Sequence, residues 1–82
     1  MKCAFGGVNE GLVVCGSEDG CVYIWNRDKG DLLSKLEGHS QMVNSVHWCP
    51  TDPYIFASVS DDMSVRIWGI EDMEMAEVVA VD

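Results

Sequence analysis

The chain has 82 residues, of which 48% are hydrophobic and 23% are charged, so its composition is that of a globular protein rather than a disordered one. Fourteen acidic residues against five basic ones give a net charge of −9. This charge is repelled by phosphate groups, so nucleic acids and membrane surfaces are not expected as partners. A chain this short forms one small domain or a piece of a larger one, with marginal stability on its own.

Eight short segments rich in β-branched and aromatic residues are predicted as strands. They cover residues 2–5, 11–16, 21–26, 31–36, 43–49, 54–59, 64–69 and, with a less regular pattern, 74–79. Pro50 and Pro53 fall between strands, where a missing N–H breaks no ladder bond. Since no segment shows sustained helical periodicity, the sequence predicts an all-β protein made of two units of four antiparallel strands.

The four cysteines are Cys3, Cys15, Cys21 and Cys49, and no two of them have Cys-x-x-Cys spacing. Buried free thiols in a reducing compartment are therefore expected in preference to a disulfide or a metal site, and no cofactor is expected. The N-terminal segment lacks the apolar run of a secretory signal, and no segment approaches the roughly 18 to 20 apolar residues of a membrane span. The expected localisation is cytoplasmic, with the nucleus as a second compartment.

The sequence repeats itself after 43 positions: residues 3–25 align with residues 46–68 without a gap. The identical pairs are Ser17 and Ser60, Asp19 and Asp62, Val22 and Val65, Ile24 and Ile67, and Trp25 and Trp68. A period of about 40 to 45 residues is typical of the four-stranded blades of a β-propeller.

Each repeat carries two adjacent acids, Glu18–Asp19 and Asp61–Asp62, which could be imagined as catalytic carboxylates. Acids that recur at the repeat period are better explained as turn residues, because Asp bonds locally in turns. No nucleophile motif, P-loop or dinucleotide fingerprint is present, so the chain is not expected to be an enzyme. Met63 stands in the second turn where Gly is common, and a positive φ there would cost on the order of 1–2 kcal/mol.

Four segments carry a family resemblance: GSEDGCVYIWN (16–26), LEGH (36–39), VNSVHWCP (43–50) and ASVSDDMSVRIWG (57–69). In this order and spacing they resemble the WD-repeat family of β-propellers, also called WD40, over residues 3–70. The dipeptide that names the family is Trp-Asn at 25–26 and Trp-Gly at 68–69. The longer segments look most like the last two blades of the WD-repeat subunit of the GID/CTLH-type E3 ubiquitin ligase.

The resemblance implies a buried hydrogen-bond network that joins His39, Ser58, Asp62 and Trp68. Trp offers a donor, Ser and His can donate and accept, and the turn aspartate accepts, so these four residue types can form a satisfied chain. In the first repeat Asp19 and Trp25 remain, but Cys15 replaces the serine and the histidine would fall before residue 1. The first repeat is therefore expected to be the less stable one.

The resemblance also implies a domain organisation and an architecture. Residues 1–40 would form a first blade that lacks its N-terminal Gly-His segment, residues 41–70 a second blade, and residues 71–82 an acidic tail that is either an outer strand or disordered. Since a closed propeller has about 4 to 8 blades, two consecutive blades make an incomplete ring with apolar faces left open.

The function that the resemblance implies is that of a protein–protein interaction scaffold, a fragment of a WD-repeat subunit that assembles a ubiquitin ligase or presents its substrates. Partner contacts are expected on one rim, around Asn9, Glu10, Ser40, Gln41, Asp52 and Tyr54. Two alternatives stay open: a truncated structural remnant without binding activity of its own, or a module that self-assembles into a complete propeller as a homo-oligomer. A hydrolase built on a propeller would need acids or histidines on the innermost strands, where the sequence offers His47 and Asn44.

Overall fold

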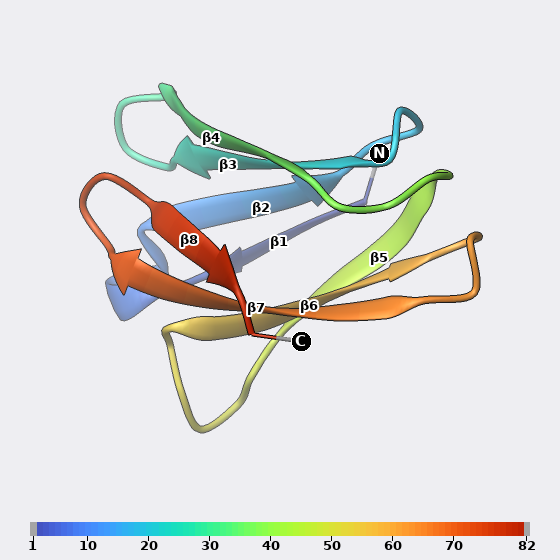
Figure 1. The fold of residues 1–82 in the computed structure, drawn as a ribbon. Helices are drawn as coiled ribbons and strands as arrows, with labels where there is room; N and C mark the ends of the chain where they lie inside the picture. Colours follow the sequence, from blue (N-terminus) through green and yellow to red (C-terminus); the bar gives the residue numbers. More distant parts are fainter. Residues whose placement is uncertain (1, 82) are drawn as a thin grey trace.

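The computed structural model describes residues 2–81, so Met1 of the predicted first blade and Asp82 of the tail lie outside the described residues. Two antiparallel sheets of four strands make up the fold, which confirms the all-β prediction (Figure 1). The first sheet contains β1 (Lys2–Gly6), β2 (Leu12–Gly16), β3 (Cys21–Asn26) and β4 (Leu32–Glu37). The second contains β5 (Val43–Trp48), β6 (Ile55–Ser60), β7 (Val65–Asp72) and β8 (Glu77–Ala80). Each sheet is a meander, in which every strand pairs with the next one along the chain.

The strand bounds lie close to the predicted ones everywhere except at the end of the chain. There β7 runs on to Asp72 and β8 covers Glu77–Ala80, whereas a strand was predicted over residues 74–79. The side chain of Asp72 accepts hydrogen bonds from the backbone N–H groups of Glu74 (3.1 Å) and Met75 (3.2 Å), which favours a turn. The described part of the tail therefore supplies the end of β7, a turn, and the outer strand β8. A further addition is the 3-10 helix η1 (Val8–Glu10).

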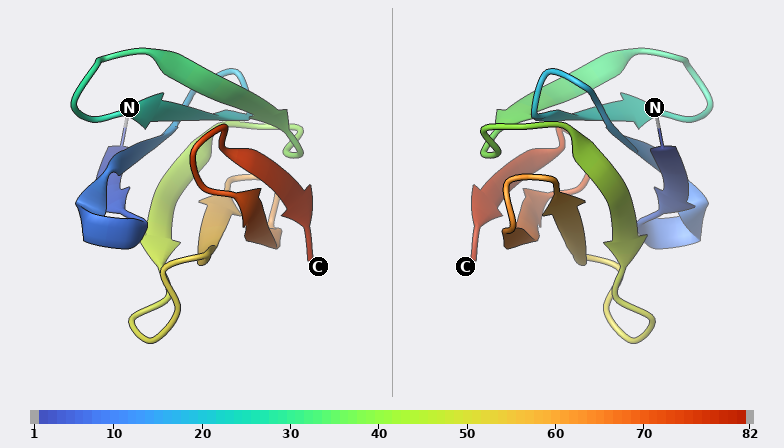
Figure 2. Two further views of the ribbon diagram at one scale, coloured as in Figure 1. Left: turned by 90° about the vertical axis from the view of Figure 1, so that its left-hand side faces the viewer. Right: turned by 90° about the vertical axis from the view of Figure 1, so that its right-hand side faces the viewer.

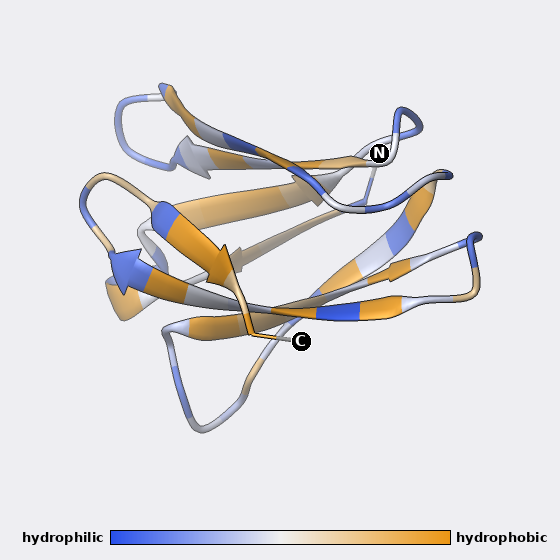
Figure 3. Cartoon of the chain, viewed as in Figure 1, coloured by the Kyte–Doolittle hydropathy of each residue, from blue (hydrophilic) through white to orange (hydrophobic). Residues whose placement is uncertain are grey.

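The two sheets pack face to face, with the apolar core between them (Figure 2). Leu12, Val14, Val22 and Ile24 of the first sheet are at most 3% exposed, and Phe56 of the second sheet is 1% exposed. Alternation along the strands places these residues on the inner faces, while polar residues gather in the turns (Figure 3). Burial of one apolar face of each sheet is therefore what joins the two repeats.

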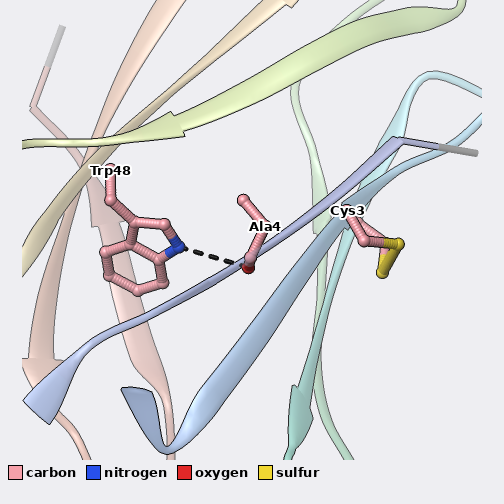
Figure 4. Close-up of a disulfide and its surroundings, with 4 residues drawn as sticks. Cys3, Ala4 and Trp48 are labelled. Carbon is pink, nitrogen blue, oxygen red and sulfur yellow. Dashed lines mark hydrogen bonds between the residues drawn. A yellow bond between two sulfur atoms is a disulfide. The ribbon is translucent and has the colours of Figure 1, made fainter. Parts of the chain in front are cut away.

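The innermost strands β1 and β5 lie next to one another, and a glycine sets how closely they approach. A Cβ atom at Gly6 would lie 2.1 Å from the ring of Trp48, so a larger residue would push this indole away. The Nε1–H group of Trp48 donates a hydrogen bond to the carbonyl oxygen of Ala4 at 3.3 Å (Figure 4). The indole therefore links the two sheets by packing and by a hydrogen bond.

The expectation of four free thiols is wrong for Cys3 and Cys15, which form a disulfide between β1 and β2 (Figure 4). The two residues are direct register partners with Cα atoms 4.0 Å apart, so neighbouring strands bring the sulfur atoms together. Cys21 is buried and Cys49 is half-buried, and both are free. A spacing of twelve residues gives no disulfide signal by itself, because the pairing depends on the register of the hairpin.

The turn between β6 and β7 has the backbone conformation that the sequence pattern indicated. Met63 has a φ of 71°, and Gly20 at the same place in the first repeat has a φ of 84°. The side chain of Met63 is 95% exposed, so no packing offsets the cost of the left-handed conformation.

We expect Met63→Gly to raise the free energy of unfolding by about 1 kcal/mol, because glycine adopts this φ without the Cβ clash. Urea titration followed by tryptophan fluorescence measures the difference. Gly20→Ala is the matched control and should lower the stability, since its Cβ would lie 2.4 Å from the carbonyl oxygen of His39. Equal stability of Met63→Gly and the unchanged chain would contradict a cost at this turn.

Candidate functional site

The connections between strands alternate between the two ends of the sheets and so form two rims (Figure 1). We call one the Asn9 rim; it contains residues 7–11, 27–31, 49–54 and 73–76. The other, the His39 rim, contains residues 17–20, 38–42 and 61–64. Backbone bonds hold the His39 rim together: Val43 N–H donates to Ser17 O at 2.9 Å, and Asp61 N–H donates to Met42 O at 3.1 Å. At the Asn9 rim, Arg27 N–H donates to Gly11 O at 2.9 Å.

The predicted single binding rim is wrong, because its six residues lie at opposite ends of the molecule. Asn9, Glu10, Asp52 and Tyr54 belong to the Asn9 rim, whereas Ser40 and Gln41 belong to the His39 rim. The chain reverses its direction at every connection between strands. The first and fifth connections (residues 7–11 and 49–54) therefore lie at one end of the strands, and the fourth (38–42) lies at the other end. The positions of the turns in the sequence already contain this alternation.

The four side chains of the expected network are joined in the second sheet. Trp68 Nε1–H donates to Ser58 Oγ at 2.9 Å, and Ser58 Oγ lies 2.7 Å from His39 Nε2. His39 Nδ1 lies 3.2 Å from Asp62 Oδ2. Since Asp62 can only accept when it is ionised, His39 Nδ1–H donates to it, and the Ser58 hydroxyl donates to His39 Nε2. Every proton in this chain then has an acceptor, and His39 Nδ1 also lies 3.0 Å from the hydroxyl oxygen of Ser64.

Asp62 also fixes the backbone on both sides of the network. Its carboxylate accepts hydrogen bonds from the backbone N–H of Ser40 at 2.9 Å, from the backbone N–H of Ser64 at 2.9 Å and from the hydroxyl of Ser64. The bond from the Ser64 hydroxyl, together with those backbone bonds and His39, lowers the pKa of Asp62 well below its usual range. Asp62 therefore connects the β6–β7 turn to the segment that enters the second sheet.

Asp61 has a different role from its neighbour. Its Oδ1 accepts a hydrogen bond from Asn44 Nδ2 at 2.6 Å, and the side chain is exposed. It makes no hydrogen bond to His39, Ser58 or Trp68. The adjacent acids therefore act as two separate turn residues, one inside the network and one at the surface.

We expect Asp62→Ala to destabilise the chain more than Asp61→Ala. The first change removes the acceptor of His39, Ser40 and Ser64, whereas the second removes a single bond to Asn44 at the surface. The midpoint of urea unfolding should fall clearly for Asp62→Ala and stay near that of the unchanged chain for Asp61→Ala. Equal midpoints would refute the distinction.

The first sheet keeps its turn aspartate and lacks the rest of the network. Asp19 accepts hydrogen bonds from the hydroxyl of Tyr23 at 2.6 Å and from the backbone N–H of Cys21 at 2.9 Å. These bonds lower the pKa of Asp19 to about 2, and the same contact raises the pKa of Tyr23 to about 12. Trp25 is half-buried, and Cys15 at the serine position is held in the disulfide. Tyr23 is therefore a hydrogen-bond donor to the turn aspartate, a role that the sequence pattern did not predict.

Because the pKa of Asp19 is lower in the folded state than its ordinary value of 3.8, its contribution to stability is present above about pH 4 and is lost as the pH falls toward 2. We therefore expect the urea midpoint to drop over this window. Asp19→Asn and Tyr23→Phe should both make the drop shallower, since the first removes the acid and the second removes its main hydrogen-bond donor. An unchanged pH dependence in both variants would contradict this assignment.

A small hollow lies on the His39 rim where β1, β2 and β5 meet. Its volume is about 180 Å3, and it is lined by Lys2, Gly16, Glu18, Met42, Val43 and Asn44. Met42 is 40% exposed and borders the network through Gln41 and Ser40. The hollow combines an exposed apolar side chain with charged and amide groups on a rim that hydrogen bonds hold in place.

The innermost strands β1 and β5 carry one histidine among the residues that the structure describes. His47 is exposed on β5, and His39 is committed to the network. Among residues 2–81 no group of three or more His, Cys, Asp or Glu residues lies close enough together to hold a metal ion. Over the same residues, no helix is long and apolar enough to cross a membrane.

Comparison with known proteins identifies the repeat. The family described as "WD domain, G-beta repeat" matches residues 3–26 and 30–69. The chain is 55% identical to the WD repeat-containing protein 26 homolog of Drosophila melanogaster over 65 residues. This alignment covers 79% of the chain and 10% of that relative. It is 50% identical over 68 residues to GID complex subunit 7 of Schizosaccharomyces pombe, covering 83% of the chain and 13% of that relative. The chain thus spans about a tenth of the length of the curated relatives it matches.

Solved structures share the same fold. A chain in the crystal structure of the Chaetomium thermophilum polycomb repressive complex 2 superimposes with a TM-score of 0.78 at 29% identity. This match covers 95% of the present chain and 17% of that one. A second such structure, an active polycomb repressive complex 2 in the basal state, gives a TM-score of 0.75 at 31% identity.

Proposed function

Because the chain belongs to the WD40-repeat family, we propose that it is a protein–protein interaction scaffold whose His39 rim contacts partner proteins. One observation carries the proposal: the His39 rim combines the hollow at Met42 with a backbone that the Asp62 network holds rigid. Binding residues on loops that a rigid scaffold positions are typical of interaction modules. The adaptable side chain of Met42 suits a surface that packs against varied partners.

The charge of the rim favours a basic partner segment. Glu18, which lines the hollow, is exposed, and so are Asp19 and Asp61 on the same rim. Lys2 is the basic residue of the lining. Charge complementarity steers association and selects against acidic partners. The partner is therefore a protein that presents lysine or arginine residues next to an apolar side chain.

The finer proposal is that the partners are subunits or substrates of a ubiquitin ligase. Its support is the 50% identity to GID complex subunit 7 of Schizosaccharomyces pombe, whose name places that relative in the GID complex. The chain would then act without catalytic activity of its own, in the cytoplasm and the nucleus. In such a compartment the Cys3–Cys15 bond is expected to be reduced.

A capture experiment with matched charge reversals tests the proposal. Tagged chain is used to capture proteins from cells, and ligase subunits are quantified by mass spectrometry. Glu18→Lys, on the His39 rim, should abolish the capture, while Glu10→Lys, on the Asn9 rim, should leave it intact. Loss with Glu10→Lys alone would move the site to the other rim. Absence of ligase subunits from the unchanged chain would favour a structural remnant without independent binding.

A further inference from the structure

The internal repeat relates each exposed sheet face to a face that is buried within the chain. In the first sheet, Leu12, Val14, Val22 and Ile24 form the face that the second sheet covers, and all are at most 3% exposed. A shift of 43 positions leads to Ile55, Ala57, Val65 and Ile67. Strand pairing places these four residues on one face of the second sheet, opposite to the face that carries Phe56 and Trp68.

This face of the second sheet is apolar and uncovered. Val65 is 55% exposed, compared with 0% for Val22 at the equivalent position. A hollow of about 290 Å3 lies on it, and His47, Cys49, Ile55, Ala57 and Ile67 contribute to its lining. The second sheet therefore repeats the surface that the first sheet buries, and we call this face the tail face.

The outer face of the first sheet, which we call the head face, also repeats a surface that is buried within the chain. Trp48, Phe56 and Trp68 pack toward the first sheet, and their equivalents after the same shift are Phe5, Val13 and Trp25. Phe5 is 58% exposed, and Leu32, the register partner of Trp25, is 47% exposed. The head face thus repeats the surface that the second sheet presents to the core.

We propose that the head face of one copy of this chain packs on the tail face of a second copy, in the same relation that joins the two sheets within the chain. Within the chain, Trp48 lies against Gly6 and donates to the carbonyl of Ala4. The equivalents of Ala4 and Gly6 are His47 and Cys49, and both line the hollow on the tail face. The equivalent of Trp48 is Phe5, so this relation directs Phe5 of one copy into the hollow of the next.

A second copy is the occupant because a single chain carries both halves of the contact. The two faces differ from each other, so the interface is heterologous, and each copy has one face left to extend the assembly. A heterologous contact gives a ring where its rotation closes, as it does between the blades of a propeller. Since propellers have about 4 to 8 blades, the ring contains about two to four copies.

Two single-face variants test the arrangement. Phe5→Asp alters the head face and Val65→Asp alters the tail face, and both side chains are more than half exposed in the single chain, so the core is left intact. Size-exclusion chromatography with light scattering should give two to four times the 9.0 kDa chain mass for the unchanged protein and the single-chain mass for each variant. Met63→Asp, in a turn that belongs to neither face, is the control and should associate normally.

Mixing the two variants separates this proposal from other modes of association. Phe5→Asp retains a tail face and Val65→Asp retains a head face, so an equimolar mixture should form a complex of two chains. A mixture that stays at the single-chain mass would overturn the head-to-tail contact, and so would association of the unchanged chain that neither variant weakens. An unchanged chain that is a folded monomer up to its solubility limit would also overturn it. These results do not depend on whether ligase subunits bind the His39 rim.

Discussion

Phe56→Ala is expected to lower the free energy of unfolding by about 3–5 kcal/mol, because it removes a buried aromatic ring and leaves a cavity. Phe56 is 1% exposed and lies between two indoles, with ring centroids 5.2 Å from Trp48 and 6.4 Å from Trp68. Its loss removes both aromatic contacts on the face of the second sheet that packs against the first. A domain of this size has a stability of the same magnitude, so the variant should be unfolded at 25 °C.

Near-ultraviolet circular dichroism measures this loss, because the signal depends on fixed aromatic side chains. Tyr54→Ala is the matched control: it removes another aromatic side chain just before the same strand, but one that is 42% exposed. The control should retain the signal and a urea midpoint close to that of the unchanged chain. A folded Phe56→Ala chain with an unchanged midpoint would show that the sheets do not depend on this contact.

Ser58→Ala is expected to produce the second large effect, a loss of about 2–4 kcal/mol in the free energy of unfolding. Ser58 is fully buried and joins the network in both directions. Without its hydroxyl, Trp68 Nε1–H loses its acceptor and His39 Nε2 loses its donor, and the buried surroundings offer no water to replace them. The cost therefore comes mainly from the two groups left without partners.

Urea titration of Ser58→Ala against Ser45→Ala tests this expectation. Ser45 lies half-buried on β5 and belongs to no part of the network. Ser58→Cys is a useful third variant, because it introduces the residue that the first repeat has at this position. If Ser58→Ala stays within about 0.5 kcal/mol of the unchanged chain, the network has no important role in stability.

The repeat made much of the fold predictable from the sequence. An alignment of residues 3–25 with residues 46–68 marks the strands twice, and strand propensity agrees with turn chemistry in both copies. The roles of Asp61 and Asp62 could also be separated, because Asp62 recurs as Asp19 whereas Asp61 is replaced by Glu18. Repetition thus distinguished a residue that the backbone of the turn requires from one that the surface tolerates.

The candidate site was less predictable, because it depends on how segments far apart in the sequence come together. The disulfide between Cys3 and Cys15 follows from the register of β1 and β2, and no spacing rule encodes that register. The contributions of Ser64 and Tyr23 depend on side-chain directions across a turn. The assignment of Ser40 and Tyr54 to opposite rims, by contrast, could have been obtained by counting the connections between strands.

The meander order of both sheets has a consequence for the folding kinetics. Every hydrogen-bonded strand pair is a hairpin between neighbours in the sequence, so the ladders form with low contact order. The contacts between the two sheets are concentrated where β1 and β2 meet β5. Hairpin formation takes about 1–10 µs, whereas docking of one sheet on the other must wait for both. We therefore expect docking of the sheets to be the slow step, in which Trp48 acquires its contacts with Gly6 and Ala4 of the first sheet. The contacts of Phe56 with Trp48 and Trp68 form earlier, with the hairpins of the second sheet.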